Sequence, residues 1–446
     1  MMNPLTSPLL TDLYQLTMLQ GYIDHDMHGT SVFEFFVRTM PDNRNFLIAA
    51  GLETVLTFLE ECRFSPEDLE FLSNTGRFSA NLLDYLEQFR FSGDIHAMPE
   101  GTVFFPNEPI IRITAPLPEA QLIESRIINL LHYQSLIATK AARCTIAAAG
   151  RAGLIDFGLR RTHGAEAGLF AARSSYIAGF AGTSTVIAEP LYGIPIFGTM
   201  AHSFIEAQAN EEEAFINFGI SNPNNVTLLI DTYDTVRGAE KVVTAAAFLR
   251  EKGITVRGVR LDSGNIADLS KRVRTILDDG GLRDVGIFVS GNMDEYTIRD
   301  LYEQAAPITG FGVGTRMDTS ADVPYFDSAY KLTEYAGKPR LKKSEGKATL
   351  PGRKQVYRRF DHNTMAGDIM TIEGDSHEGR PLVRHYMERG ERLAPALDLT
   401  DIREFTMQQI DGLPPYLRKL EKTSPYPVEL SKALLDMKEE IEETLE

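Results

Sequence analysis

Seven short apolar runs recur between residues 153 and 315, and they constrain the possible fold more than any other feature. Helix-length segments separate them, most clearly at 236–253 and at 266–281, where closing glycines mark a helix C-terminus. Strands that are buried on both faces of a parallel sheet read as nearly continuous apolar runs. The pattern therefore predicts an α/β fold, an irregular barrel of about seven parallel strands, with an open doubly wound sheet as the alternative. The runs are 153–158, 177–185, 194–202, 225–234, 255–265, 285–292 and 307–315.

Polar residues follow the apolar part of each run. In α/β barrels the active site lies at the carboxyl ends of the strands. These ends meet at a single edge of the sheet, so we expect a functional cluster there, although ordinary loop polarity explains any one residue equally well. The strand-end residues are Asp156, Thr183, Ser184, His202, Asp231, Asp262, Asn292 and Thr315.

The sequence on either side of the barrel region has a different character. Residues 1–120 mix strand-like and helix-like segments, which predicts an α+β domain. Residues 121–330 are expected to hold the barrel, which is entered through a long helical stretch. Residues 331–446 contain a basic island at 339–354, followed by strand-like sequence and an acidic terminal helix.

Composition excludes several classes of function. The chain has 446 residues, with 45 Lys and Arg against 62 Asp and Glu, so its formal net charge is −17. Binding to nucleic acids or to anionic membranes needs clustered positive charge, so neither partner is expected. Two cysteines, Cys62 and Cys144, are too few for a disulfide framework or a cysteine-based metal site. No apolar run reaches the about 18 residues of a membrane span, and the N-terminus lacks the features of a signal peptide, which favours a reduced, cytoplasmic protein.

Two glycine-rich turns follow the last two runs. SGN (290–292) and GFGVGT (310–315) would let backbone N–H groups approach a phosphate closely. A dinucleotide-binding turn would need a helix directly after it, whereas RMDTSADVP follows GFGVGT. Tight turns without a ligand are the alternative. The candidate phosphate-binding residues are Ser290, Gly291, Asn292, Gly314 and Thr315.

Charged and aromatic residues near other strand ends point to a sugar-phosphate ligand. Arg260 and Asp262 are two apart on a predicted strand, so their side chains project to the same side. The carboxylate suits ribose hydroxyls or Mg²⁺ and the arginine suits phosphate, although a structural salt bridge has the same spacing. Phe157 offers a flat apolar face and Arg160 a fork for a planar carboxylate, and the alternative is a core phenylalanine beside a surface arginine.

Three further residues complete the candidate set. A neutral imidazole at the position of His202 would act as a base or accept a phosphoryl group, although a lone histidine is usually structural. Lys140 and Arg143 lie at i and i+3 of a predicted helix and therefore on one face. That face either lies toward phosphate or is simply solvated.

Eight short motifs follow one another in a fixed order along the chain. They are TDLYQLTM (11–18), ATKAAR (138–143), DFGLRR (156–161), GTMAHS (198–203), LLIDTYDT (228–235), RLDSGN (260–265), SGN (290–292) and GFGVGT (310–315). The series resembles that of the nicotinate phosphoribosyltransferases, and the likeness extends from about residue 6 to about residue 420. It implies the irregular α/β barrel of the type II phosphoribosyltransferases, with a second domain built from N- and C-terminal sequence.

The resemblance implies an activity in the salvage of NAD. Nicotinate would be joined to phosphoribosyl diphosphate, giving nicotinate mononucleotide and diphosphate, with Mg²⁺ as cofactor and ATP hydrolysis driving the reaction. His202 matches the histidine that is transiently phosphorylated in this family. Phe157 and Tyr14 match the aromatic residues on the two sides of the pyridine ring, and Tyr14 would come from the partner subunit of a homodimer. Arg160 matches the arginine near the ring substituent.

The same resemblance assigns the sugar-phosphate contacts. Arg260 and Asp262 match the ribose and phosphate contacts, and we expect them to be catalytic together with His202. We expect Lys140 and Arg143 to neutralise the departing diphosphate together with Mg²⁺. The basic island is either a lid over these phosphates or a flexible surface loop. The cradle for the 5′-phosphate is matched by Gly291, Asn292, Gly314 and Thr315.

Nicotinamide phosphoribosyltransferases form the nearest competing family. Ser184 stands where the amide enzyme looks to carry an aspartate. A carboxylate there would accept hydrogen bonds from a carboxamide but would repel a nicotinate carboxylate, whereas a serine hydroxyl donates to it. We therefore expect a preference for the acid, with Arg160 as the counter-charge. A non-catalytic nucleotide-binding barrel is a further alternative.

Overall fold

The computed structural model describes residues 7–343 and 349–444. The chain divides into two compact units. One unit contains the described residues up to Thr139 together with those from Val323 onward, and the other contains Lys140–Asp322. Sequence from both ends of the chain thus builds one unit and the middle of the chain builds the other.

The middle unit alternates strands and helices. Its strands are β6 (Gly153–Asp156), β7 (Gly182–Thr183), β8 (Val226–Leu229), β9 (Val256–Leu261), β10 (Gly286–Val289) and β11 (Gly310–Val313). Its helices are the end of α6 (Glu124–Ala148), the 3-10 helix η1 (Leu159–Arg161), α7 (Ala165–Ile177), α8 (Ala188–Tyr192), α9 (His202–Glu206), α10 (Glu211–Ser221), α11 (Thr235–Glu251), α12 (Ile266–Asp279), α13 (Glu295–Glu303) and α14 (Thr315–Asp318).

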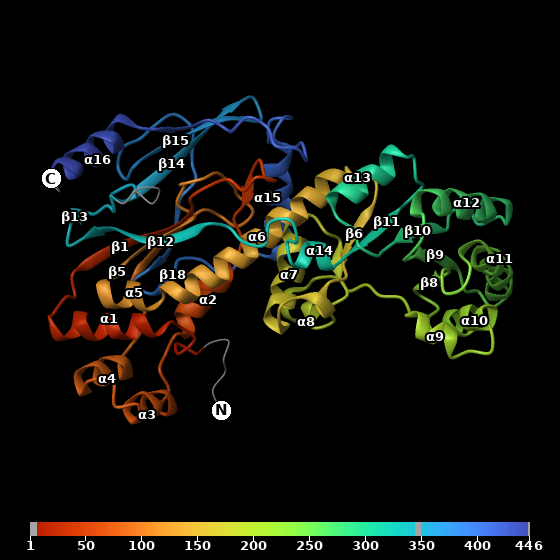
Figure 1. Cartoon of the computed structure of the whole chain (residues 1–446), viewed down its shortest axis with the longest axis horizontal. Helices are drawn as coiled ribbons and strands as arrows, with labels where there is room; N and C mark the ends of the chain where they lie inside the picture. The colour runs from red at the N-terminus through yellow and green to blue at the C-terminus, as the bar shows by residue number, and fades with distance from the viewer. Residues whose placement is uncertain (1–6, 344–348, 445–446) are drawn as a thin grey trace. The chain divides into compact units, whose positions relative to one another are not determined.

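These strands form one parallel sheet in the order β7-β6-β11-β10-β9-β8. The sheet curls like part of a barrel wall, and α11 and α12 pack against β9 and β10 (Figure 1). β6 and β11 are the first and the last of these strands along the chain. They pair side by side in the sheet, with Val313 opposite Asp156. The fully buried apolar side chains of the strands are Val226, Leu228, Leu229, Val259, Leu261, Ile287, Val289, Phe311 and Val313.

Two predicted strands are shorter than expected. The run at 177–185 supplies only β7, because α7 extends to Ile177. The run at 194–202 contributes a single parallel bridge, between Ile196 and Thr183. Proline at position 195 has no N–H to give to a ladder, and Ile196 is 39% exposed, so this segment lacks the two-sided burial of a central strand. In the described part of the chain the sheet therefore has six strands rather than about seven.

The turns after β8, β9 and β10 each end in a side chain that caps the next helix. Asp234, Asn265 and Asp294 accept hydrogen bonds from the backbone N–H three residues later, at 2.8, 3.3 and 2.8 Å. Such caps satisfy N–H groups that the first helical turn leaves unpaired. They fix where α11, α12 and α13 begin and so limit the length of the turns that carry the candidate residues.

The other unit is mixed α+β. Its strands are β1 (Thr30–Val37), β2 (Leu47–Ile48), β3 (Asp94–Ala97), β4 (Val103–Phe104), β5 (Ile111–Pro116), β12 (Ser328–Tyr335), β13 (Lys338–Pro339), β14 (Lys354–Asp361), β15 (Thr364–Ile372), β16 (Arg380–Pro381), β17 (Arg384–Glu388), β18 (Glu391–Arg392) and β19 (Val428–Leu430). Its helices are α1 (Leu13–Asp24), α2 (Leu52–Glu61), α3 (Pro66–Asn74), α4 (Ala80–Glu87), α5 (Leu117–Leu122), most of α6, α15 (Leu399–Asp411) and α16 (Lys432–Thr444).

Its largest sheet joins sequence from both ends of the chain. Seven strands follow the order β13-β12-β1-β5-β3-β17-β18, and β1 pairs antiparallel with both β5 and β12. A four-stranded sheet, β16-β14-β15-β19, and a two-stranded sheet, β2-β4, complete the unit. The N-terminal sequence therefore supplies three of these seven strands and the C-terminal sequence supplies four, as the predicted fold class requires.

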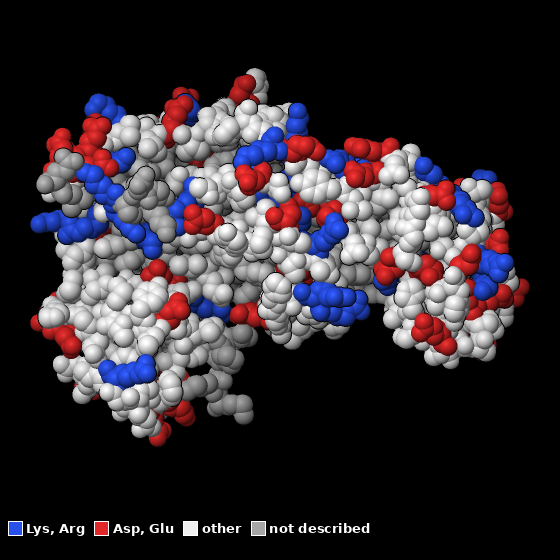
Figure 2. All heavy atoms as spheres, viewed as in Figure 1, with Lys and Arg blue, Asp and Glu red and all other residues white. Residues whose placement is uncertain are grey.

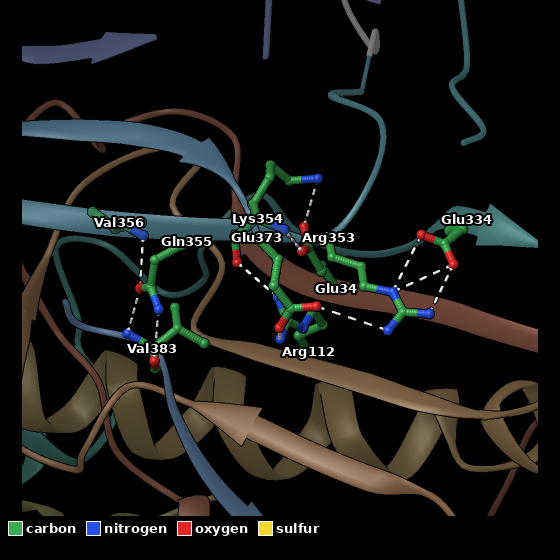
Figure 3. A network of polar contacts seen from close by, with 9 residues as sticks. All are labelled: Glu34, Arg112, Glu334, Arg353, Lys354, Gln355, Val356, Glu373 and Val383. Atoms are coloured by element: carbon green, nitrogen blue, oxygen red, sulfur yellow. Dashed lines mark hydrogen bonds and ion pairs between the residues drawn. The ribbon is translucent and has the colours of Figure 1, made fainter. Parts of the chain in front are cut away.

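A partly buried network of ion pairs and hydrogen bonds connects the end of the basic island to this sheet (Figure 3). Nζ of Lys354 lies 2.7 Å from Oε2 of Glu34, and both side chains are buried. Arg112 donates to the carbonyl oxygen of Lys354 at 3.1 Å, and Nη2 of Arg353 lies 2.9 Å from Oε1 of Glu334. Burial lowers the pKa of Lys354, and the charge of Glu34 opposes that shift.

The basic island is therefore not a single free segment. Arg353 and Lys354 are held in the sheet by their carboxylate partners. At the other end, the N–H of Lys342 donates to the hydroxyl of Thr349 at 3.0 Å. The lid interpretation concerns the intervening residues 344–348 above all, and these lie outside the described residues.

Acidic and basic side chains are mixed on the surface. Over the face drawn in Figure 2, Asp and Glu are interspersed with Lys and Arg. Within the ranges that the structure describes, no helix combines the length and the apolar composition needed to cross a bilayer.

Candidate active site at the carboxyl edge of the parallel sheet

Arg260 stands at the centre of a polar cluster on the carboxyl edge of the parallel sheet. Its Nε donates to the Ser290 hydroxyl at 2.8 Å, and its Nη2 donates to Oδ1 of Asp262 at 3.0 Å. Its Nη1 donates to the carbonyl oxygen of Met200 at 3.2 Å and to the hydroxyl of Thr199 at 3.3 Å. One guanidinium thus links the ends of β9 and β10 to the segment that leads into α9.

Asp262 is paired with Asp231 at the ends of β9 and β8. The N–H of Asp262 donates to Oδ2 of Asp231 at 2.9 Å, and the hydroxyl of Ser290 donates to Oδ1 of Asp262. Burial acts to raise the pKa of Asp262, but the Ser290 hydrogen bond and the charges of Arg260 and His202 outweigh it and hold that pKa below its usual value. Asp262 is therefore an ionised carboxylate at neutral pH.

His202 lies beside this cluster, as the first residue of α9. Its Nδ1 is 3.1 Å from the hydroxyl of Thr232, the residue that follows Asp231. The imidazole is half-buried, and its charge, when present, helps to lower the pKa of Asp262. The three residues predicted to be catalytic, His202, Arg260 and Asp262, thus share one edge of the sheet.

Phe157 forms an apolar wall next to the arginine. It directly follows β6, and its N–H donates to the carbonyl oxygen of Val313 at 2.8 Å. Its ring centre lies 5.5 Å from that of Phe288 and 5.6 Å from the guanidinium carbon of Arg260, within the range of a cation–π contact. A half-buried ring beside a guanidinium is a suitable surface for a flat, negatively charged ligand.

The two predicted phosphate turns follow neighbouring strands, β10 and β11. Gly291 has a φ of +88°, and a Cβ there would lie 2.3 Å from the carbonyl oxygen of Asp262, so only glycine fits. Asn292 continues the turn with a φ of 52°. Gly314 follows the last residue of β11, and Thr315, which is exposed, is the first residue of α14. Backbone N–H groups of both turns are therefore presented at the same edge.

Ser184 and Arg160 lie next to the first strands of the sheet. The N–H of Ser184 donates to the carbonyl oxygen of Asp156 at 2.8 Å, and the residue is half-buried just beyond β7. Arg160 is exposed on η1, which begins shortly after Phe157. Both residues thus come from turns that adjoin the end of β6.

Tyr14 belongs to the other unit. It is 46% exposed on α1, where Met18, four residues later, lies on the same helix face and is also exposed, as is Leu13 at the start of the helix. Leu10, just before the helix, is exposed as well. A hollow of about 490 Å³ adjoins the start of this helix. The residues that line the hollow are Leu9, Thr11, Leu13, Leu16, Phe71, Leu72, Thr75, Arg77 and Phe78.

Lys140 and Arg143 are not at the open edge of the sheet. Both are 1% exposed. Nζ of Lys140 lies 2.6 Å from Oε2 of Glu295 and 2.7 Å from Oδ1 of Asp322, and Nε of Arg143 lies 2.8 Å from Oε1 of Glu295. They share one face of α6 as predicted, but that face is covered and its charge is compensated. Direct contact with a phosphate would require these ion pairs to open.

Two carboxylates at the edge of the sheet offer oxygen ligands for Mg²⁺. Among residues 7–343 and 349–444, no group of three or more His, Cys, Asp or Glu side chains is arranged to hold a metal ion. Mg²⁺, however, is usually bound by one or two carboxylates plus substrate phosphates and waters. Oδ1 of Asp231 is buried without a hydrogen-bond partner, while its Oδ2 accepts from Asp262 and Ser263. Asp231 and Asp262 therefore fit an ion that is shared with a diphosphate.

Sequence comparisons agree with this geometry. The N-terminal domain of nicotinate phosphoribosyltransferase (NAPRTase) matches residues 9–132, the NAPRTase family matches residues 153–357, and the C-terminal domain matches residues 375–438. Nicotinate phosphoribosyltransferase pncB2 of Mycobacterium tuberculosis is 48% identical over 427 residues, which cover 95% of this chain and 91% of that protein. The chain belongs to the nicotinate phosphoribosyltransferase family. The resemblance inferred from the eight sequence motifs is thereby confirmed.

More distant members of the nicotinate phosphoribosyltransferase family match over nearly the whole chain. The nicotinate phosphoribosyltransferase of Bacillus subtilis (strain 168) is 33% identical, covering 98% of this chain and 97% of its own length. The crystal structure of human nicotinic acid phosphoribosyltransferase has a TM-score of 0.87 and 26% identity, covering 97% of this chain and 99% of the human chain. The predicted fold class is confirmed by this structural match.

Sequence patterns alone do not assign a role to three residues of this candidate site. Asp231 is recognised as a strand-end residue, and its place at the end of the run at 225–234 was the available signal. Thr232 and Thr199 contact His202 and Arg260 through turns whose paths depend on tertiary packing. No local pattern marks either threonine.

Proposed function

We propose that this protein joins nicotinate to phosphoribosyl diphosphate, giving nicotinate mononucleotide and diphosphate in the salvage of NAD. The observation that carries the proposal is the convergence of Phe157, Arg260 and Asp262 at one edge of the sheet, in a chain whose relatives bear this enzyme name. A flat ring, a guanidinium and a carboxylate at one place suit an aromatic anion next to a sugar phosphate.

The residues account for the main demands of the reaction. Breaking the bond at ribose C1 builds positive charge on the sugar ring. We place the pyridine ring on Phe157, which holds its nitrogen in line with C1, and the nicotinate carboxylate near Arg160. The 5′-phosphate binds the backbone N–H groups of the SGN and GVGT turns. The ionised Asp262 accepts hydrogen bonds from the ribose hydroxyls and stabilises the positive charge on the ring.

We assign Mg²⁺ to Asp231 and Asp262. The ion, when bound, supplies charge neutralisation for the leaving diphosphate. Lys140 and Arg143 contact the diphosphate directly only if their ion pairs with Glu295 open. In the described arrangement they hold the start of α13, which begins just after the SGN turn.

We infer that ATP hydrolysis is coupled to the reaction through His202. With Nδ1–H donated to Thr232, the lone pair of Nε2 is available to attack the γ-phosphorus of ATP, and ADP leaves. The new phosphate adds negative charge and acceptor oxygens at the entrance to α9. Arg260, which already binds the segment before His202, is a cation at the same edge that can form an ion pair with this phosphate.

The direct test is a product assay with nicotinate, phosphoribosyl diphosphate, Mg²⁺ and ATP on the wild type, His202→Ala and His362→Ala. The His362 side chain is 96% exposed in the other unit, so this variant controls for the loss of a histidine. We expect His202→Ala to lose the ATP hydrolysis that accompanies product formation and His362→Ala to retain it. A wild type that binds the substrates but forms no product would overturn the proposed function in favour of a non-catalytic barrel. An unaffected His202→Ala would overturn only the phosphohistidine.

We further propose that the enzyme prefers nicotinate to nicotinamide and works as a homodimer in the cytoplasm. The neutral Ser184 and the cationic Arg160 support the acid preference.

The exposed apolar residues of α1 support a dimer in which Tyr14 closes the partner's site, since these residues are otherwise left in water. Cys62 and Cys144 are free thiols, as a reducing compartment allows.

A further inference from the structure

Two buried carboxyl groups meet at the end of β6. Asp156 is the last residue of β6 and is fully buried, and Asp318 is the last residue of α14 and is 1% exposed. The pairing of Val313 with Asp156 brings the end of β11, and therefore α14, next to β6. Gly158 shows how close the approach is, because a Cβ on it would lie 1.9 Å from Oδ2 of Asp318. Any larger residue at 158 would have to displace this carboxyl group.

Asp156 holds two turns that carry the proposed nicotinate contacts. Its Oδ1 accepts a hydrogen bond from the N–H of Gly158 at 2.8 Å, in the turn that presents Phe157. Its Oδ2 accepts from the hydroxyl of Thr183 at 2.6 Å, and its carbonyl oxygen accepts from the N–H of Ser184 at 2.8 Å. The orientation of both turns therefore depends on this one residue.

Asp318 connects the same place to the proposed phosphate turn. Its N–H donates to the carbonyl oxygen of Gly314 at 3.0 Å, so its position is coupled to that of Gly314 and Thr315. Both oxygens of its carboxyl group are buried, and the group lies against Gly158, whose N–H binds Asp156, so the two carboxyl groups interact. A hydrogen bond between two carboxyl groups requires a proton on one of them.

We propose that Asp318 is a positioning residue whose carboxyl group stays protonated and donates to Asp156, so that the pair carries one negative charge behind the nicotinate site. This inference rests on the proposed function, because it takes Phe157 and Ser184 as nicotinate contacts. The shared proton fixes the Phe157, Ser184 and Thr315 turns to one another. It also keeps a second negative charge away from a substrate that is itself a carboxylate.

Electrostatics favour this assignment of the proton. Burial and then the charge of Asp156 raise the pKa of Asp318 well above the usual carboxyl range. Burial also raises the pKa of Asp156, but hydrogen bonds from Thr183 and Gly158 act in the opposite direction. The proton therefore resides on Asp318, because the hydrogen bonds from Thr183 and Gly158 stabilise the ionised form of Asp156. The titratable and charged groups on the elements and turn that adjoin the pair are Arg160, Arg161, His163, Glu166, Arg173 and Arg316.

The charge of the pair changes at alkaline pH. As pH rises through the raised pKa of Asp318, the pair passes from one negative charge to two, while the nicotinate carboxylate is ionised throughout. If only the singly charged pair admits nicotinate, the apparent KM rises about tenfold per pH unit above that pKa. The free energy of unfolding falls at lower pH, between the usual carboxyl pKa of the unfolded chain and the raised pKa of Asp318, because in that interval the unfolded state has already released this proton.

The test measures KM and kcat for nicotinate from mildly acidic to alkaline pH in the wild type, Asp318→Asn and Asp318→Leu. Asparagine keeps a hydrogen-bond donor to Asp156 but cannot ionise, so we expect the alkaline rise in KM to disappear while KM stays closer to the wild type than in Asp318→Leu. Leucine removes the donor, so KM is raised at every pH. If Asp318→Asn shows the same alkaline rise as the wild type, or if Asp318→Leu keeps the wild-type profile, the proposal is wrong.

Two controls separate this inference from others. Glu108 is a buried carboxyl of the other unit whose pKa is also raised by burial, so Glu108→Gln changes the pH dependence of stability but not the alkaline rise in KM. Phe157→Ala tests the nicotinate site itself. If Phe157→Ala leaves the KM for nicotinate unchanged, the proposed site fails. If Phe157→Ala raises the KM for nicotinate, and the KM of Asp318→Asn still rises at alkaline pH, only the carboxyl-pair inference fails.

Discussion

The guanidinium carbon of Arg260 lies 5.6 Å from the ring centre of Phe157, while the same guanidinium holds Asp262 and Ser290 by hydrogen bonds. This relationship joins the part of the site proposed for the pyridine ring to the part proposed for the sugar phosphate. The two parts come from strands β6 and β9, which are not neighbours in the sheet. A side chain that spans them must have both length and several donors in fixed directions, which arginine provides.

Arg260→Lys is expected to lower kcat/KM by about 10–100-fold, because lysine keeps the charge but cannot bind Asp262, Ser290 and the Met200 carbonyl at once. Hydrogen bonds to charged groups contribute about 1.5–3 kcal/mol each, which sets this range. Steady-state kinetics with nicotinate and phosphoribosyl diphosphate measure the effect.

Arg274→Lys provides the matched control for this substitution. Arg274 donates to Asp278 and to the carbonyl oxygens of Leu282 and Val285, so it loses a similar set of bonds at the end of α12. We expect Arg274→Lys to lower stability without changing kcat/KM. Equal kinetic losses in the two variants would mean that Arg260 acts only through the stability of the fold.

Ser184→Asp and Ser184→Asn test charge at nearly constant side-chain size. A like charge beside the nicotinate carboxylate costs several kcal/mol, so we expect Ser184→Asp to raise the KM for nicotinate by about 100-fold or more. The neutral asparagine should raise it far less. Kinetics with nicotinate and nicotinamide as alternative substrates measure both effects, and equal losses in the two variants would assign the change to size rather than to charge.

The parallel sheet and its carboxyl edge, where the candidate site lies, could be predicted because strands that are buried on both faces have nearly continuous apolar sequences. The runs at 225–234, 255–265, 285–292 and 307–315 each contain a strand, since their apolar residues have no solvent-facing side. Parallel strands end at one edge, so Arg260 and Asp262 could be expected to meet residues from the following strand. Ser290, which contacts both, is the confirmed instance of that contact.

Other features could not be predicted, because local sequence does not say what covers a face. The run at 177–185 is apolar since the end of α7 and the following turn are buried, and over a few residues such burial is indistinguishable from that of a strand. Helical spacing places Lys140 and Arg143 on one face of α6. Their partner Glu295 lies 152 residues from Arg143 in the sequence, so only tertiary structure shows that this face is closed.

Lys354→Met is expected to destabilise the mixed α+β unit by about 3–5 kcal/mol, because it leaves the buried carboxylate of Glu34 without its counter-charge. The double variant Glu34→Gln with Lys354→Met removes both charges and should recover most of that loss. Urea unfolding followed by circular dichroism measures the change. Lys432→Met is the control, since its pair with Asp436 is exposed to solvent and adds little to stability. A loss in the double variant as large as in Lys354→Met would show that the charge pair is not the source.

Mixing inactive variants tests whether Tyr14 completes the partner's site. If the site combines Phe157 of one subunit with Tyr14 of the other, a dimer of one Tyr14→Ala chain and one Phe157→Ala chain contains one site with both aromatic residues intact. We therefore expect co-refolding of these two weakly active variants to restore product formation. Phe157→Ala mixed with Arg260→Ala is the matched control, because both residues belong to the same unit and every site in the mixture lacks one of them. If both mixtures stay equally inactive, Tyr14 does not act across a subunit interface, and the shared site is wrong.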